Sequence, residues 1–225
     1  MHIVGLILIV YAVFLLSVFV LFKEEVKSTK EKDPAAKNIL EILILYPSLQ
    51  AIVLYRVAHP LWTMGIPFLP RAISQFARLF TGIEIHPGAK IGRGLFIDHG
   101  MGVVIGETTI IGNNVTLFQG VTLGGTGKET GKRHPTLGSN IVVGAGANIL
   151  GNITIGDNSY IGANAVVLRD VPPNSTVVGV PGHVTKQEGQ RIDLMLDHAN
   201  VSDPIWQHMK DMVRRIKTLE DKEKK

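Results

Sequence analysis

The chain begins with a long apolar run. Residues 3–22 cover twenty positions without a charged side chain, and apolar residues would occupy every side of a helix drawn through them. At 1.5 Å per residue such a helix spans roughly 30 Å, the thickness of the hydrocarbon core of a bilayer. Residues 1–22 are therefore expected to form a hydrophobic helix that anchors the chain in a membrane. A buried helix or a contact within an oligomer is the alternative.

A charged stretch follows at residues 23–32 and is expected to be a linker. It contains Lys23, Lys27, Lys30 and Lys32, whereas no Lys or Arg precedes the apolar run. Positive charges beside a membrane segment favour the cytoplasmic side. Everything after residue 22 is therefore expected in the cytoplasm, tethered to the inner face of the cell membrane through residues 3–22.

The spacing of apolar residues over 33–80 is helical. Asp33-Pro34 has the form of an N-cap followed by Pro at the first helical position. Prolines recur at positions 47, 60, 67 and 70, and Pro interrupts helices. The segment is therefore expected to form several short helices.

From residue 81 the apolar positions recur every six residues. Neither a helix, with a period of 3.6, nor an ordinary strand, with a period of 2, explains this spacing. Repeats of six are typical of a parallel β-helix, in which each hexapeptide forms one side of a triangular coil. The positions are Ile85, Ile91, Ile97, Val103, Thr109, Val115 and Val121, and, after a break, Leu137, Val143, Ile149, Ile155, Ile161 and Val167.

The predicted fold is therefore mainly β: a left-handed parallel β-helix over residues 81–182, preceded by the helical segment and followed by a C-terminal helix. Roughly fifteen hexapeptides give about five coils. The spacing from Ile85 to Val121 contains no slip, so each inward side chain is expected to stack on its equivalent eighteen residues away.

Two regions depart from the period. Leu123 and Leu137 are fourteen residues apart, which is not a multiple of six, so residues 124–136 are expected to leave the coil as a protruding loop. The loop contains several glycines and the basic residues Lys128, Lys132, Arg133 and His134. Residues 183–225 form the tail, where Ser202-Asp203-Pro204 predicts a helix start. An amphipathic stripe then follows at Met209, Met212, Val213, Ile216 and Leu219.

Composition changes this picture only slightly. The chain has 225 residues and no cysteine, which excludes disulfides and thiolate metal sites. The formal net charge of +4 is mild. Aromatic residues do not alternate with the basic ones as a single-strand binding surface requires. No nucleic-acid partner is therefore expected.

His99 is the first candidate for chemistry. Its place in the period of six matches that of Ile105 and Ile111, so the imidazole is expected at an inward position, where a histidine is unusual. Glu84 lies on the preceding coil, and a carboxylate beside an imidazole fixes its tautomer and makes it a better base. A buried histidine bonded to backbone is the structural alternative.

Several motifs together resemble the serine acetyltransferase family. They are residues 82–92, Asp98-His99, residues 104–108, the Gly-Gly-Thr-Gly-Lys run at 124–128, and Arg133-His134-Pro135. The resemblance covers about residues 33–185. The hexapeptides alone indicate only an acyltransferase-like fold, whereas the glycine loop with Arg-His-Pro is more discriminating.

The resemblance implies transfer of acetyl from acetyl-CoA to the hydroxyl of L-serine, giving O-acetylserine and CoA in cysteine biosynthesis. His99 is then the general base that takes the hydroxyl proton. Glu84 orients it, although the family often has Asp at that position. No metal is expected to take part.

The resemblance also assigns the substrate contacts. Asp33 and Asp98 face the amino group of serine, and Arg133 with His134 holds its carboxylate, because the planar donors of Arg match a carboxylate.

CoA is implied to lie in a groove between neighbouring β-helices, beside the small residues Gly125, Ala145 and Ala163. The implied assembly is a homotrimer or a dimer of trimers. Relatives often bind O-acetylserine sulfhydrylase through a C-terminal Ile. The sequence ends in Lys225, so that partner is not expected.

Three alternatives stay open. A hexapeptide acetyltransferase acting on a sugar or other hydroxyl would share the fold and the base, but it would not need Asp33 or the Arg133-His134 pair. A zinc-dependent carbonic anhydrase would need His86, His99 and His134 to converge. A membrane scaffold without catalytic activity would need none of these polar residues.

Overall fold

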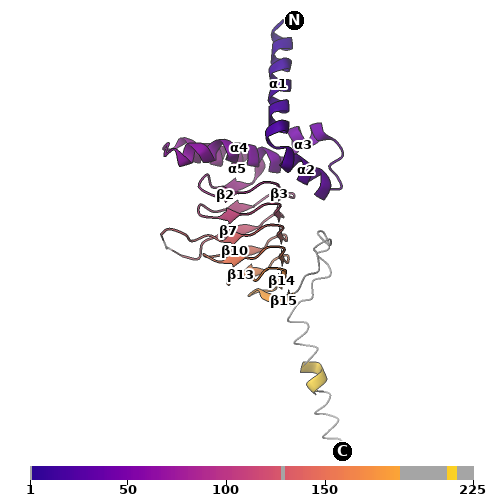
Figure 1. The fold of residues 1–225 in the computed structure, drawn as a ribbon, viewed down its shortest axis with the longest axis vertical. Helices are drawn as coiled ribbons and strands as arrows, with labels where there is room; N and C mark the ends of the chain where they lie inside the picture. The colour runs from indigo at the N-terminus through magenta and orange to yellow at the C-terminus, as the bar shows by residue number, and fades with distance from the viewer. Residues whose placement is uncertain (1, 128–129, 188–211, 217–225) are drawn as a thin grey trace, which may run out of the picture.

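A computed structural model of the chain describes residues 2–127, 130–187 and 212–216. Helices occupy the N-terminal part, and short strands wound into a coil follow them (Figure 1). The strands form three sheets in which neighbours along the coil pair in parallel. This arrangement confirms the predicted left-handed parallel β-helix.

The β-helix has three faces, which the chain visits in turn. The first face consists of β1 (Glu84–Ile85), β4 (Val104–Ile105), β7 (Thr122–Gly124), β10 (Asn148–Leu150) and β13 (Val166–Val167). The second consists of β2 (Lys90–Ile91), β5 (Ile110–Ile111), β8 (Thr136–Leu137) and β11 (Thr154–Ile155). The third consists of β3 (Phe96–Ile97), β6 (Thr116–Leu117), β9 (Val142–Val143), β12 (Tyr160–Ile161), β14 (Ser175–Val178) and the antiparallel β15 (His183–Gln187).

The register of the first coil differs from the expected eighteen-residue repeat. Ile105 does pair with Leu123, eighteen residues on, but Ile85 pairs with Ile105, twenty residues on. Two additional residues therefore lie between β3 and β4, and the prediction of an unbroken period was wrong here. Leu123 pairs with Ile149, twenty-six residues on, because the expected loop lies between them.

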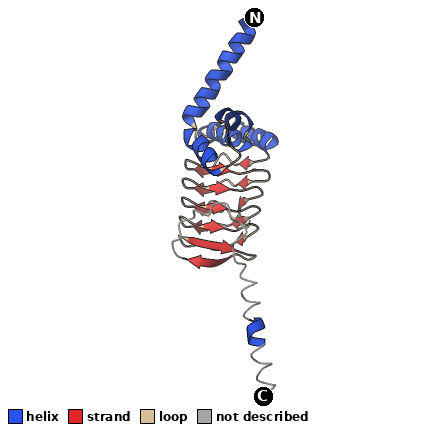
Figure 2. Ribbon diagram, turned by 90° about the vertical axis from the view of Figure 1, so that its right-hand side faces the viewer, coloured by secondary structure: helices blue, strands red, loops and turns tan. Residues whose placement is uncertain are grey.

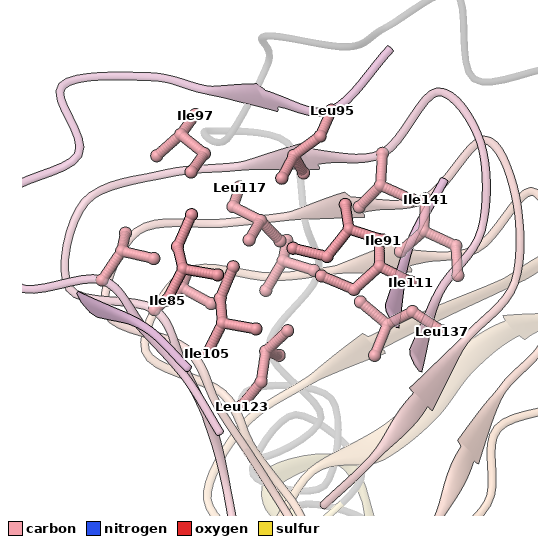
Figure 3. Close-up of a cluster of buried hydrophobic side chains, with 14 of the residues drawn as sticks. Ile85, Ile91, Leu95, Ile97, Ile105, Ile111, Leu117, Leu123, Leu137 and Ile141 are labelled. Atoms are coloured by element: carbon pink, nitrogen blue, oxygen red, sulfur yellow. The ribbon is translucent and has the colours of Figure 1, made fainter. Parts of the chain in front are cut away.

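The core is a stack of aliphatic side chains that point inward from all three faces. Ile85, Ile105 and Leu123 come from the first face, while Ile111 and Leu137 come from the second (Figure 3). All of them are buried. Each such side chain stabilises the fold by roughly 1.5–3 kcal/mol relative to exposure.

Five helices precede the coil in the described part of the chain. They are α1 (His2–Leu21), α2 (Lys23–Lys32), α3 (Ile39–Leu45), α4 (Pro47–Thr63) and α5 (Leu69–Thr81). The expected linker at 23–32 is thus a helix, because Val26, Ser28 and Thr29 are buried on one side of it. The expected N-cap at Asp33 was also wrong: Asp33 ends α2, and Asn38 caps α3 by accepting a hydrogen bond from Leu40 N at 2.9 Å.

The helices cover the open edge of the first coil (Figure 2). Neighbouring coils exchange backbone hydrogen bonds in both directions: His86 N donates to Ile105 O, and Gly102 N donates to Gly82 O. The first coil has a neighbouring coil on one side only, so the carbonyls on its open side need donors from elsewhere. Ser74 Oγ donates to Ile85 O at 2.7 Å, and Tyr55 OH donates to Ala89 O at 2.7 Å. Without these caps the edge could pair with another chain.

Helix α1 projects away from the rest of the molecule (Figure 1). Large apolar side chains such as Ile7, Val10, Leu16 and Leu21 are exposed on it. Within the described residues, however, no single helix combines the length and apolarity of a membrane span. In the same part of the chain, α3 and α4 meet that test as a pair, and the two helices are bent by 62° relative to each other. The anchor over residues 1–22 is therefore not confirmed and stays a prediction.

The far end of the coil closes with a hairpin. β15 pairs antiparallel with β14 and covers the last edge. Beyond it, residues 212–216 are helical, and Met212, Val213 and Ile216 on this turn are exposed. The expected helix start at residues 202–204, Met209, Leu219 and the terminal Lys225 lie outside the described residues.

Asparagines line the corner between the second and third faces. Asn114, Asn140, Asn158 and Asn174 all have φ of 57–58°, the left-handed region that Asn tolerates better than most residues. Their side chains form a ladder in which each amide donates to the next, at 2.8, 3.1 and 3.1 Å. The ladder ties four successive coils together along this edge.

We expect Asn140→Ala to lower the free energy of unfolding by about 1–3 kcal/mol, because Ala loses both ladder bonds and is strained at positive φ. Asn140→Gly loses the same bonds without the strain and should cost less. Denaturant unfolding of the two variants beside the wild type measures the difference. Equal stability of all three proteins would show that the ladder contributes nothing.

Candidate active site

The two additional residues of the first coil lie at the corner between the third and first faces, which we call the His99 corner (residues 98–102). His99 has φ of 57° and is exposed, and Met101 beside it is 68% exposed. The turn closes through a hydrogen bond from Met101 N to His99 O at 3.0 Å. The expected inward position of His99 was therefore wrong, because the insertion turns the imidazole out of the coil.

Three residues, two of them alanines, stack on the coils beyond His99 along the same edge. Gly120 N donates to Met101 O, Gly146 N donates to Gln119 O, and Asn164 N donates to Ala145 O. These bonds stack Gln119, Ala145 and Ala163 on successive turns of this corner. Ala145 is half-buried and Ala163 is exposed. The backbone of this edge is therefore accessible to a long, thin ligand.

Two predicted carboxylates lie close to the His99 corner. Asp98 directly precedes His99, and Asp33 accepts a hydrogen bond from Tyr46 OH at 2.7 Å. Burial raises the pKa of Tyr46. The hydrogen bond to Asp33 and the negative charges of Asp33, Glu41 and Asp98 raise it further. Tyr46 is thus hydrogen-bonded to Asp33 and lies within the electrostatic influence of Asp98. The sequence did not reveal this role of Tyr46, because Tyr46-Pro47 indicated only a helix boundary.

Glu84 lies on β1 and pairs with Val104 of β4. Val104 follows His99 by five positions in the sequence. Its carboxylate forms an ion pair with Arg78 Nη1 at 3.0 Å. In the described part of the chain it makes no hydrogen bond to His99. The structure therefore places Glu84 on the face that starts at the His99 corner, but it does not form the expected pair.

Arg133 and His134 lie at the other end of the first face, at the corner between the first and second faces. We call this the loop corner (residues 86–88, 106–108, 125–127 and 130–135). Arg133 Nη2 contacts Glu107 Oε2 at 2.7 Å, and His134 is 8% exposed. Gly125 is also here, because a Cβ on it would lie 3.3 Å from Arg133 O. The predicted CoA residues are thus divided between two corners of one chain.

The end of the loop is held firmly against the second coil. Lys132 Nζ donates to the backbone carbonyls of Thr108 at 2.8 Å, of Pro135 at 3.2 Å and of His134. Thr108 Oγ1 accepts hydrogen bonds from the backbone N–H groups of Arg133 and His134, at 3.0 and 3.1 Å. The loop therefore presents Arg133 and His134 from a fixed base.

His86 completes the loop corner. Burial lowers the pKa of His86 to about 4, helped by the positive charge of Arg71 and opposed by Glu107. Trp62 packs edge-on against its ring, with centroids 4.9 Å apart. His86 and His134 share this corner, whereas His99 is at another. Among the described residues no three His, Asp or Glu side chains are grouped to hold a metal ion, so the zinc-site histidines do not converge within one chain.

The chain resembles known proteins over most of its length. Residues 134–169 match the family model "Bacterial transferase hexapeptide (six repeats)". A serine acetyltransferase from Staphylococcus xylosus is 55% identical over 194 residues, which cover 86% of this chain and 90% of that protein. One from Synechococcus elongatus is 57% identical over 191 residues, covering 85% and 78%.

Solved structures agree with these relatives. The Neisseria gonorrhoeae serine acetyltransferase in complex with serine aligns with a TM-score of 0.72 and 40% identity, over 76% of this chain and 69% of that one. The Brucella abortus enzyme in complex with coenzyme A aligns with a TM-score of 0.72 and 38% identity, over 75% and 67%.

Proposed function

The chain belongs to the serine acetyltransferase family, and we propose that its His99 corner carries out the reaction of that family. The enzyme transfers acetyl from acetyl-CoA to the hydroxyl of L-serine and releases O-acetylserine and CoA. The observation that carries the assignment to particular residues is the exposed imidazole of His99. A two-residue insertion presents it on the edge that also contains Ala145 and Ala163.

His99 acts as the general base. It takes the proton of the serine hydroxyl while that oxygen attacks the thioester carbonyl, and the tetrahedral intermediate then collapses with loss of the CoA thiolate. The protonated imidazole returns the proton to the leaving sulfur, so that no net proton is taken up. An exposed ring on an ordered turn can reach both atoms.

The acceptor site pairs opposite charges. Asp33 and Asp98 offer carboxylates to the amino group of serine, and their combined influence on Tyr46 supports their proximity. Arg133 and His134 offer N–H donors to its carboxylate. A sugar acceptor has neither charge, so this set favours an amino acid over the alternative of a sugar or another hydroxyl. It also argues against a scaffold without activity.

A complete site requires two protomers. Within one chain the first face separates His99 from Arg133 and His134. One serine molecule cannot contact both corners, because strands rise about 3.3 Å per residue and the face is several residues wide. In a closed trimer the His99 corner of one protomer meets the loop corner of its neighbour. Doubling of this trimer through residues 33–80 remains part of the proposal.

The same geometry supports a place for acetyl-CoA between neighbours. Ala145 and Ala163 of one protomer and Gly125 of the next would line the groove beside His99. Because these residues have at most a methyl group as side chain, the pantetheine arm of CoA could approach the backbone closely. No metal enters the proposed chemistry, since the base and the leaving group are supplied without one.

The N-terminal helix α1 bears on where the protein is located in the cell. The exposed apolar surface of α1 supports contact of residues 3–22 with the inner face of the cell membrane. Flotation of the full-length chain with lipid vesicles, compared with a chain lacking residues 1–24, would decide this point.

The reaction itself is tested with an acceptor panel. Purified protein should release CoA from acetyl-CoA with L-serine and far less with galactosides. His99→Ala should lower turnover by roughly 10²–10⁴-fold, the usual contribution of a general base, with an unchanged circular dichroism spectrum. Unchanged turnover would make His99 a structural residue.

Glu84 is tested against its ion-pair partner. If Glu84 orients His99, Glu84→Gln should lower kcat by roughly 10²-fold or more, whereas Arg78→Met should leave kcat near that of the wild type. If Glu84 only holds helix α5 to the coil through Arg78, the two variants should behave alike. Comparing kcat and thermal stability for both variants separates these roles.

A shared site predicts complementation. His99→Ala and Arg133→Ala chains each lack one half of every site, but mixed trimers contain some interfaces where both halves are intact. Random assortment of equal amounts would restore about a quarter of the sites. Activity assays after co-expression measure the recovery. No recovery, with mixed trimers shown by mass spectrometry, would mean that each site lies within one chain.

A further inference from the structure

Thr108 makes an unusual set of contacts at the loop corner. Its side-chain oxygen accepts hydrogen bonds from the backbone N–H groups of Arg133 and His134, at 3.0 and 3.1 Å. The same oxygen lies 2.9 Å from Nδ1 of His134, and the backbone N–H of Thr108 donates to that nitrogen at 3.2 Å. One residue therefore contacts both the loop backbone and the ring.

These contacts determine where the ring carries its proton. The Thr108 oxygen already accepts two N–H groups, so its own hydrogen points to Nδ1 of His134. Nδ1 thus faces two donors, an O–H and an N–H, and must be an acceptor. In a neutral imidazole the proton then resides on Nε2. A charged ring would direct a second N–H against the backbone N–H of Thr108.

The surroundings favour the neutral ring. Burial lowers the pKa of His134, and the positive charges of Arg133 and Lys132 lower it further, against the opposing charge of Glu107. The ring packs closely against Gly106, where a Cβ would clash with Cδ2 and Nε2 and would lie 2.8 Å from Cγ. His134 therefore has little freedom to turn over and exchange its two nitrogens.

Nε2 is the ring nitrogen that the neighbouring residues leave unused. Within the described residues, both hydrogen-bond contacts of the His134 ring are made by Nδ1, and the residue is 8% exposed. Its Nε2–H is available to an acceptor from outside.

We propose that Thr108 is a positioning residue that holds His134 as the neutral Nε2–H tautomer and fixes the backbone of Arg133-His134. The carboxylate of the acceptor then meets one neutral N–H donor beside one guanidinium. This inference rests on the proposed function, because that carboxylate is the one of serine. His134 acts here as a hydrogen-bond donor and not as a second base.

The tautomer can be observed directly in the full-length protein. Long-range ¹H–¹⁵N spectra of protein labelled in its histidines distinguish an unprotonated Nδ1 from a protonated one, and His134→Gln assigns the signal by its loss. We expect an unprotonated Nδ1 and a protonated Nε2 at neutral pH, without substrate. A protonated Nδ1, alone or in a charged ring, overturns the inference.

Kinetics test the consequence for binding. Thr108→Val keeps the shape but removes the hydroxyl, and it should raise KM for serine by about tenfold or more, the effect of losing hydrogen bonds around a charged ligand. KM for acetyl-CoA should change by less than about twofold under the same reasoning. Thr108→Ser should restore the wild-type KM for serine. An unchanged KM in Thr108→Val overturns the inference.

The neighbouring threonine supplies a matched control. Thr109 is buried, and within the described residues its hydroxyl has no hydrogen-bond partner. Thr109→Val makes the same chemical change one residue away and should leave KM for serine unchanged. Failure of this inference also differs from failure of the proposed function. If only the inference about Thr108 fails, the wild-type protein still acetylates serine. If the proposed function fails, the His134 tautomer is as expected but the wild-type protein does not acetylate serine.

Discussion

The backbone ladder between coils is the constraint on which the rest of the molecule depends. Neighbouring coils exchange backbone hydrogen bonds, and a parallel pair holds its register only if equivalent residues return to the same height and face. A shift by one residue would turn the aliphatic stack outward. Extra residues can therefore enter only at corners, where the chain is between strands. Both insertions in this chain obey the rule, and both carry proposed site residues.

The two insertions differ in length and in how their backbone is held in place. The shorter one, at the His99 corner, adds only two residues and closes with its own backbone hydrogen bonds. It produces a rigid turn whose left-handed residue projects an imidazole. The longer one forms the loop, which gains reach but would lose precision without support. Thr108 and Lys132 supply that support by bonding its last residues to the neighbouring coil. The proposed general base and the proposed carboxylate-binding pair are thus both presented from ordered backbone.

The sequence predicted the β-helix but misplaced one register, for a physical reason. Two positions in each hexapeptide point inward, such as Val103 and Ile105, and both are buried. A two-residue insertion replaces one of these inward positions by the other in the spacing of six. The period therefore seems to continue from Ile97 to Val103, although the residue in the same strand position as Ile97 is Ile105. The loop was visible because eight extra residues cannot be absorbed in this way. Tyr46 and Thr108 act through contacts distant in sequence, which no local pattern encodes.

The helical segment links the stability of the coil to the proposed acceptor site. Its donors satisfy carbonyls that the first coil would otherwise expose, as Ser74 and Tyr55 do, so the helices are fixed relative to β1 and β2. The same segment contains Tyr46, which holds Asp33 through its hydroxyl. Asp33 is thus positioned by elements whose first role is to close an edge. This explains why the proposed amino-group site lies next to the capped coil. The helical cap and the His99 insertion belong to the same coil, so a residue of the helical segment can approach His99 there.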